Sequence, residues 1–307
     1  MLIERVLMFQ FLYHVMYLSL GDVSAGWVYP SKIQADKSDL KRWFDLTFSH
    51  FSLLNKNFSS SETGVAPISG FVFNPPDWTL ATCSMWMRQM KQEEIDAFVA
   101  FKTNQSHEEV YRFDTWTCDC LVYLPWLTKK ITEKGGNFIQ GRILNLKELS
   151  NYDVIVNCSG LGSRELVPDP NVYPVKGQVY TVKAPWIKHF YEFEDSLYVL
   201  PKLNEVIVGG TKDKYDTSWE VNQDESKRIW KQCCERLPSL RTAKIIQEKV
   251  GFRPTRDPVL LKMESSTKVV HCYGHGGSGV TLSWGCAVEV SELVAQLLRD
   301  TESKSKL

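Results

Sequence analysis

The chain has 307 residues, of which 43% are hydrophobic, 12% aromatic and 23% charged. This composition is too apolar for a disordered chain and too polar for a multi-span membrane protein, and the length suits one large or two smaller globular domains. Lysine and arginine number 36, as do aspartate and glutamate, so the basic excess of a nucleic-acid-binding protein is absent and no nucleic-acid partner is expected.

The first twenty residues resemble a signal peptide. A charged start is followed by an apolar run over Val6–Leu20, and Val23-Ser24-Ala25 has the small residues of a cleavage site. The run is too short for a membrane span, which needs roughly 20 residues, so no span is expected. The alternative is a buried helix or strand of the fold.

The next part of the chain shows helical and strand patterns in alternation. They predict a helix within 31–60, strand and turns over 64–73, a turn at 74–77 and a short helix over 92–101. An amphipathic helix over 121–134 ends at Gly135-Gly136 as at a C-terminal cap, and a strand is expected over 137–143. A helix, a glycine cap and a strand in this order are typical of an α/β fold.

The second half of the chain begins with the near-continuous apolar run 153–158, which is typical of a buried parallel strand. The spacing then predicts an antiparallel meander of strands 177–183, 196–200 and 205–210, followed by helix 224–237, strand 269–273 and helix 281–299. The fold class is therefore α/β, with a parallel domain built from discontinuous stretches and an inserted, mainly antiparallel sheet domain.

The two ends of the chain make conflicting predictions about location. Ser305-Lys306-Leu307 at the C-terminus is a peroxisomal address read by an import receptor. A secreted protein would not need this address. We expect the peroxisomal matrix; the alternative is a secreted or cytosolic protein, if the apolar N-terminus or an alternative start dominates.

The cysteines and histidines do not predict a metal site. The eight cysteines form no CxxC pair and are interpreted as reduced thiols; they are Cys83, Cys118, Cys120, Cys158, Cys233, Cys234, Cys272 and Cys286. The six histidines form no evident ligand set, and no Ser/His/Asp order is identifiable.

A glycine-rich segment over 274–279 satisfies the pattern G-x-G-x-x-G between a predicted strand and a helix. The conventional dinucleotide interpretation fails, because no parallel strand with an acidic residue follows. Glycines still let the backbone approach a planar or anionic group, and the helix starting near Val280 directs its positive end there. The alternative is a tight strand–helix turn, but four glycines in six residues favour a binding loop.

Three side chains elsewhere are candidates for ligand binding. Arg253 lies between Phe252 and Pro254 in an extended segment, where a guanidinium group can bind a carboxylate. Pairing with an internal carboxylate such as Glu248 is an equal alternative. Tyr198 on a strand is more typical of core packing, and Lys212 is more typical of a solvated loop than of a pocket.

The motifs together resemble the D-amino-acid oxidase and D-aspartate oxidase family of FAD flavoenzymes, over about residues 21–307. The motifs that carry the resemblance are Asp22-Val23-Ser24-Ala25-Gly26, Asp153-Val154-Ile155-Val156-Asn157-Cys158-Ser159-Gly160, Val250-Gly251-Phe252-Arg253-Pro254-Thr255-Arg256, Tyr273-Gly274-His275-Gly276-Gly277-Ser278-Gly279 and Trp284-Gly285-Cys286-Ala287. The resemblance favours a peroxisomal location and makes Val23-Ser24-Ala25 part of a cofactor-contacting loop instead of a cleavage site.

The resemblance implies a division into two domains. An incomplete Rossmann-like FAD-binding domain would comprise 1–60, 115–170 and 265–307, and a substrate-binding and interface domain would comprise 61–114 and 171–264. A homodimer is left open. The cofactor-binding residues would be Ala25, Gly26, Ile143, Ser159, Gly160, His275, Gly276, Gly277, Ser278, Gly279, Val280 and Thr281.

The resemblance also implies a reaction, with a D-amino acid and O2 as the small-molecule partners. Arg253 would bind the substrate carboxylate, Tyr198 would donate a hydrogen bond to it, and Gly277 would also contact the substrate. Hydride transfer from Cα to flavin N5 needs no side-chain acid or base if the amine enters neutral, and the products would be a 2-oxo acid, ammonia and hydrogen peroxide.

Substrate preference depends on Lys212, which stands where the D-aspartate branch of the family has an arginine. A lysine keeps the charge without the bidentate fork, which favours acidic D-amino acids such as D-aspartate and D-glutamate. Gly277-Ser278-Gly279 is closer to the branch that takes neutral D-amino acids, which is the alternative.

The chain departs from the family pattern at its beginning. Residues 1–20 contain no glycine, so they cannot supply the G-x-G-x-x-G turn that binds the FAD pyrophosphate. The first βα unit is atypical or missing, which would leave apolar sheet surface exposed unless Leu2–Leu20 fills the slot. A catalytically inactive variant unable to hold FAD is therefore a second hypothesis.

Overall fold

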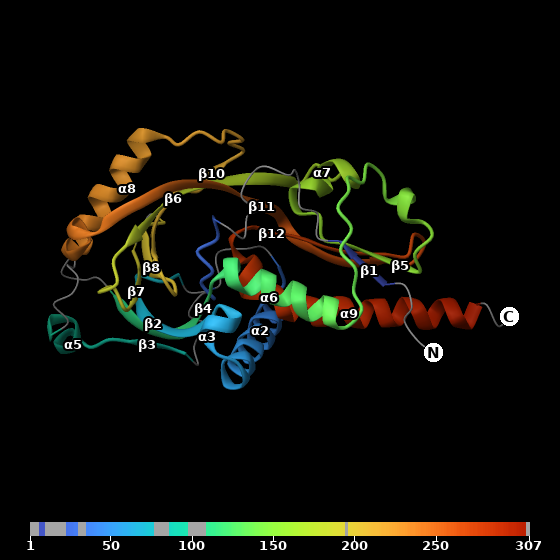
Figure 1. Ribbon diagram of the computed structural model, residues 1–307, viewed down its shortest axis with the longest axis horizontal. Helices are drawn as coiled ribbons and strands as arrows, with labels where there is room; N and C mark the ends of the chain where they lie inside the picture. Colours follow the sequence, from blue (N-terminus) through green and yellow to red (C-terminus); the bar gives the residue numbers. More distant parts are fainter. Residues whose placement is uncertain are drawn as a thin grey trace.

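The computed structural model describes residues 6–9, 23–29, 35–76, 86–97, 109–193 and 196–304. Its centre is a twelve-stranded mixed sheet (Figure 1). In spatial order the strands are β1 (Val6–Phe9), β5 (Val154–Asn157), β12 (Val269–His275), β11 (Lys244–Glu264), β6 (Val172–Lys183), β9 (Val206–Gly209), β8 (Tyr198–Pro201), β7 (Phe190–Glu192), β2 (Val65–Phe73), β4 (Val110–Cys118) and β3 (Met87–Gln89), and β10 (Asp213–Lys214) pairs with β6.

One end of the sheet is parallel. Strand β5 is buried at all four positions and pairs in parallel with β12 on one side and β1 on the other. This confirms the buried parallel strand predicted over 153–158. Residues 6–9 form a strand of the fold, in register from Val6 opposite Val154 to Phe9 opposite Asn157. The rest of the first 22 residues lies outside the described part of the chain.

The predicted antiparallel meander is confirmed and extends further than the sequence patterns indicate. Strands β6, β9, β8 and β7 are antiparallel neighbours, and β7 continues in parallel into β2. Strands β4 and β11 were not predicted, although β11 is 21 residues long and pairs with both β6 and β12. The sheet is therefore continuous from the parallel end to β3.

The predicted helices are present. They are α2 (Lys37–Asn57), α5 (Gln92–Ala97), α6 (Cys120–Glu133), α8 (Gln223–Arg236) and α9 (Gly279–Lys304), with the short α3 (Ser60–Thr63) and α7 (Ser163–Leu166) and the 3-10 turns η1 (Leu146–Leu149), η2 (Gly160–Gly162), η3 (Pro238–Thr242) and η4 (Gly276–Ser278). Helix α6 ends at Glu133 with Lys134 as its C-cap. Gly135 follows with a φ of +86°, which suits glycine, and the Gly136 N–H donates to the Ile131 carbonyl. In Figure 1, α8 lies above β6 and β11, and α2, α6 and α9 lie below them.

The strand predicted over 137–143 is wrong. These residues pair with no strand of the described chain, and Phe138 and Ile139 are 60% and 69% exposed. Apolar character favours a strand only where a neighbour offers backbone hydrogen bonds, and the described edge beyond β5 is taken by β1. Residues 98–101 of the predicted short helix, and Ser305–Leu307 of the peroxisomal address, lie outside the described residues.

No helix in the described part of the chain is long and apolar enough to cross a membrane. The described cysteines are all free thiols. The largest buried clusters flank the antiparallel strands, and aromatic side chains such as Phe44, Phe51, Phe113 and Phe190 fill the one that includes residues of α2, α6 and α9. This packing fixes the strands that carry the candidate site.

Candidate active site

Arg253 lies on β11, next to strand β6. Its guanidinium group occupies the space above Gly177, where a Cβ atom would come within 2.6 Å of both terminal nitrogens. Nη1 donates to the carbonyl oxygen of Thr211 at 3.0 Å and to that of Lys176 at 3.4 Å. The glycine in the middle of β6 is therefore what lets the arginine lie flat across the strand.

The positive charge of Arg253 is not neutralised by any described carboxylate. No ion pair of Arg253 is formed within the described ranges, and Glu248, the internal partner considered from sequence, instead accepts a hydrogen bond from the Ser226 hydroxyl. A half-buried guanidinium group that forms no ion pair and has five N–H donors keeps donors for an anionic ligand.

Tyr198 stands beside Arg253. Its ring packs over Gly209 of the neighbouring strand, where a Cβ atom would lie 2.6 Å from the ring carbon Cζ. Burial raises the pKa of Tyr198, although the adjacent Arg253, which hydrogen-bonds the phenol, acts to lower it. The hydroxyl group therefore stays protonated and can donate to an anion held by Arg253.

Lys212 follows Thr211 directly in the chain. Much of its side chain is accessible to solvent, yet surrounding protein atoms lower the pKa of its ammonium group by desolvation, as does the charge of Arg253, while Glu192 raises it. Lys212 forms no ion pair with a described residue, so two unpaired cations face one region.

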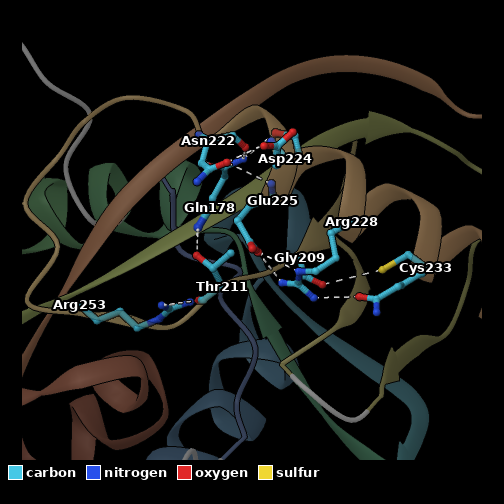
Figure 2. A network of polar contacts seen from close by, with 11 residues as sticks. Gln178, Gly209, Thr211, Asn222, Asp224, Glu225, Arg228, Cys233 and Arg253 are labelled. Carbon is cyan, nitrogen blue, oxygen red and sulfur yellow. Dashed lines mark hydrogen bonds and ion pairs between the residues drawn. The ribbon is translucent and has the colours of Figure 1, made fainter.

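A network of buried hydrogen bonds holds this region in place (Figure 2). The Thr211 hydroxyl accepts from the Gln178 main-chain N–H at 3.1 Å, and the Gln178 side chain donates to the Asn222 carbonyl at 3.0 Å and accepts from the Asn222 N–H at 2.8 Å. Asn222 in turn caps α8. The carbonyl that binds Arg253 is thus tied to the N-terminus of a helix.

The glycine-rich segment 274–279 forms the turn between β12 and α9, as expected. Gly274 and Gly276 have φ values of +92° and +53°, which L-residues avoid. No side chain caps the 3-10 turn that follows His275, and a Cβ atom at Gly279 would meet open space. The 26-residue helix α9 begins at Gly279, directly after this turn, so the positive end of its dipole lies at the glycine-rich segment.

Two further segments carry predicted cofactor residues, and the first of them reaches the same helix terminus. Residues 25–29 lie beside α9, because the Thr281 hydroxyl accepts from the Tyr29 N–H at 3.1 Å and lies 3.0 Å from the Tyr29 carbonyl. Gly160, with a φ of +57°, follows β5, and a Cβ atom added there would lie 3.5 Å from Pro254 Cβ. Val280 packs into the aromatic core, and Ile143 packs apart from these groups, against Ile155 and Val269.

Sequence reasoning missed the residues that support the binding side chains. Gly177 and Gly209 make room for Arg253 and Tyr198, and Gln178 positions the Thr211 segment. A glycine inside a strand was the available signal, because it costs stability unless something must approach the backbone closely.

The comparisons with known proteins agree with this geometry. The family model for FAD dependent oxidoreductases matches residues 23–293. D-aspartate oxidase from Homo sapiens is 37% identical over 94% of this chain and 87% of its own length, and D-aspartate oxidase 1 from Caenorhabditis elegans is 32% identical over 83% and 81%. The chain belongs to the D-amino-acid oxidase and D-aspartate oxidase family of FAD-dependent oxidoreductases. The crystal structure of glycine oxidase from Geobacillus kaustophilus has a similar fold, with a TM-score of 0.76 and 14% identity over 91% of this chain and 85% of that one.

Family membership makes this protein an enzyme and implies FAD as its cofactor. The described residues fit a flavin at the β12–α9 turn, because glycines form the turn, a Cβ atom at Gly279 would meet open space and the positive end of α9 lies there. The buried Trp27 Nε1, next to this turn, has no hydrogen-bond partner in the described residues. A bound group with acceptor atoms would satisfy such donors.

Substituting Gly177→Ala tests the cradle. The added Cβ displaces the Arg253 guanidinium group, so the dissociation constant for a small carboxylate such as propionate should rise about tenfold or more, the usual cost of losing a charge-assisted hydrogen bond. Titration calorimetry on the FAD-loaded enzyme measures it. Gly141→Ala, at a site where a Cβ meets no atom within 4 Å, is the control and should bind like the wild type. Equal affinities in the two variants would show that Arg253 does not need Gly177.

Proposed function

We propose that this protein catalyses FAD-dependent oxidative deamination of D-amino acids, with acidic ones such as D-aspartate and D-glutamate preferred. The products are 2-oxo acids, ammonia and hydrogen peroxide. The observation that carries the proposal is the pair Arg253 and Tyr198, an unpaired cation and a phenol donor held against two strand glycines, with Lys212 beside them.

The roles of the binding residues follow from their chemistry. Arg253 binds the α-carboxylate through its free donors, and the Tyr198 hydroxyl donates a second hydrogen bond to it. Holding the carboxylate at two points fixes the direction of the Cα–H bond. When bound, FAD supplies the hydride acceptor and is reoxidised by O2. No side-chain base is needed when the amine enters neutral.

We assign the cofactor to residues at the α9 terminus. The set is Ala25, Gly26, Ser159, Gly160, His275, Gly276, Gly277, Ser278, Gly279, Val280 and Thr281, with Ile143 further away and Gly277 also facing the substrate. The positive end of α9 stabilises negative charge that develops nearby. Segments 1–60, 115–170 and 265–307 would form the cofactor domain, and 61–114 and 171–264 the substrate domain, on one continuous sheet.

The preference for acidic substrates rests on Lys212. An ammonium group that forms no ion pair within the described part of the chain attracts the second carboxylate of D-aspartate. The D-aspartate oxidases from Homo sapiens and Caenorhabditis elegans support the same class. The second candidate is a neutral D-amino acid, favoured by Gly277-Ser278-Gly279 and by the 36% identical D-amino-acid oxidase from Rubrobacter xylanophilus.

The spectrum of the purified protein tests whether it holds the cofactor. We expect flavin absorbance corresponding to about one FAD per chain, and hydrogen peroxide formation on addition of a D-amino acid but not its L-enantiomer. A colourless protein that takes up no added FAD would instead support the second hypothesis, a catalytically inactive variant unable to hold FAD.

Substituting Lys212→Ala tests the substrate class. Loss of the ammonium group should lower kcat/KM for D-aspartate about tenfold or more and change that for D-alanine less than about twofold, since only D-aspartate carries a second carboxylate. Steady-state oxygen consumption measures both. Lys214→Ala on β10 is the matched control. Unchanged D-aspartate turnover in Lys212→Ala would remove this lysine from substrate recognition.

We further propose that the enzyme acts in the peroxisomal matrix, because the chain carries Ser305-Lys306-Leu307 at its C-terminus. Removing these three residues should move an N-terminally tagged protein from peroxisomes to the cytosol in fluorescence microscopy. Retention in peroxisomes after the deletion would contradict a role for this tripeptide.

A further inference from the structure

Glu192 is a buried carboxyl group close to Tyr198 and Lys212. It lies at the end of β7, beside Val72 of β2 on one side and Tyr198 of β8 on the other. The Tyr29 hydroxyl hydrogen-bonds this carboxyl group, but the atom Oε2 is buried without any hydrogen-bond partner in the described residues. A buried oxygen of this kind costs free energy unless a ligand satisfies it.

The sheet order places Glu192 on the far side of Tyr198 from Arg253. Strand β11 carries Arg253, and β6, β9, β8 and β7 follow in that order. Because Glu192 and Tyr198 are direct cross-strand partners, their side chains share one face of the sheet. A ligand whose α-carboxylate is held by Arg253 and Tyr198 would therefore extend its side chain toward Glu192.

The charged and titratable groups around Glu192 come from several elements. Tyr29 comes from the segment before α2, Tyr198 from β8 and Lys212 from the segment after β9, while β2 contributes the apolar Val72. Burial raises the pKa of Glu192 to about 7, although the Tyr29 hydrogen bond and the charge of Lys212 both act to lower it. Near neutral pH the group therefore exists in both protonation states.

An ionised Glu192 and an acidic substrate are incompatible. Two carboxylates that share one buried site cannot both ionise without a large cost, and one of them takes up a proton. A neutral Glu192 has an O–H donor where the ionised form has only acceptors.

We propose that Glu192 is a specificity-determining residue of the substrate pocket, which as the neutral acid donates a hydrogen bond to the side-chain carboxylate of D-aspartate. The inference rests on the proposed function and deepens it. The Lys212 ammonium group attracts the side-chain carboxylate of the substrate. Glu192 donates a hydrogen bond to that carboxylate only after it has taken up a proton from solvent. Above pH 7, binding of an acidic substrate is then coupled to uptake of one proton at Glu192. An isosteric amide side chain carries its own donor and needs no such uptake.

Calorimetry on the FAD-loaded enzyme tests this coupling with two ligands that lack an amine and cannot be oxidised, succinate and its monoamide succinamate. Titrations run from pH 6 to pH 8.5 in two buffers of different ionisation enthalpy, so that proton uptake is measured together with affinity. The variants are Glu192→Gln, which keeps a donor and cannot ionise, and the exposed control Glu165→Gln.

In the wild type and in Glu165→Gln, we expect the dissociation constant for succinate to rise roughly tenfold per pH unit above 7, with uptake approaching about one proton at pH 8, because only the protonated fraction is competent. Succinamate should bind with little dependence on pH. In Glu192→Gln, succinate affinity should be independent of pH and proton uptake should vanish.

Succinate binding to the wild type without proton uptake at pH 8 would overturn the proposal whether or not the variant folds. Uptake that persists in Glu192→Gln would assign the proton to another group and overturn it equally. The proposed function fails separately, if the holoenzyme oxidises no D-amino acid, and it stands if D-aspartate is oxidised without any linked proton.

Discussion

The antiparallel pairing of β6 with β11 is the constraint on which the rest of the structure depends. It runs from Lys244 opposite Lys183 to Arg256 opposite Val172, and through β12 it joins the parallel end of the sheet to the antiparallel end. Because backbone hydrogen bonds fix the register along this length, Arg253 has one possible neighbour on β6. The position of Arg253, the proposed carboxylate-binding group, is therefore set by the sheet and not by a loop, as precise recognition requires.

Glycines convert this register into a binding surface. Gly177 and Gly209 occupy neighbouring strands and leave shallow depressions that Arg253 and Tyr198 fill. A glycine inside a strand lowers the stability of the sheet, and here it allows the close approach of the Arg253 and Tyr198 side chains. The hydrogen bonds that join Thr211, Gln178 and the N-terminus of α8 fix the position of the Thr211 segment, whose carbonyl accepts from Arg253.

Much of the fold could be predicted from sequence, because periodicity reports which face is buried. Helices such as α2 and α9, the buried strand β5 and the meander all followed from apolar spacing. The errors in strand prediction, for β11 and for segment 137–143, have a common cause. Whether a segment forms a strand depends on which segments lie beside it in the fold, and a local sequence pattern does not contain this information. The same holds for the site. Arg253 could be selected from the sequence because an arginine in an extended segment is a typical carboxylate ligand. Glu192 became a candidate only because the fold places it opposite Tyr198 on the adjacent strand.

In the proposed site, the groups that would bind the substrate side chain differ from those that would bind its α-carboxylate. Arg253 is the proposed ligand of the α-carboxylate, and its planar guanidinium group can bind both carboxylate oxygens. Lys212 and Glu192 carry opposite charges, influence each other's protonation and are both shifted by burial toward their neutral forms. In the proposed site, recognition of the part that all D-amino acids share would depend on Arg253, and recognition of the substrate side chain would depend on two groups whose protonation is coupled. Substitution of the Glu192 or Lys212 side chain would then change the choice among D-amino acids, because Arg253 donates to the main-chain carbonyl oxygens of Lys176 and Thr211 and not to these side chains.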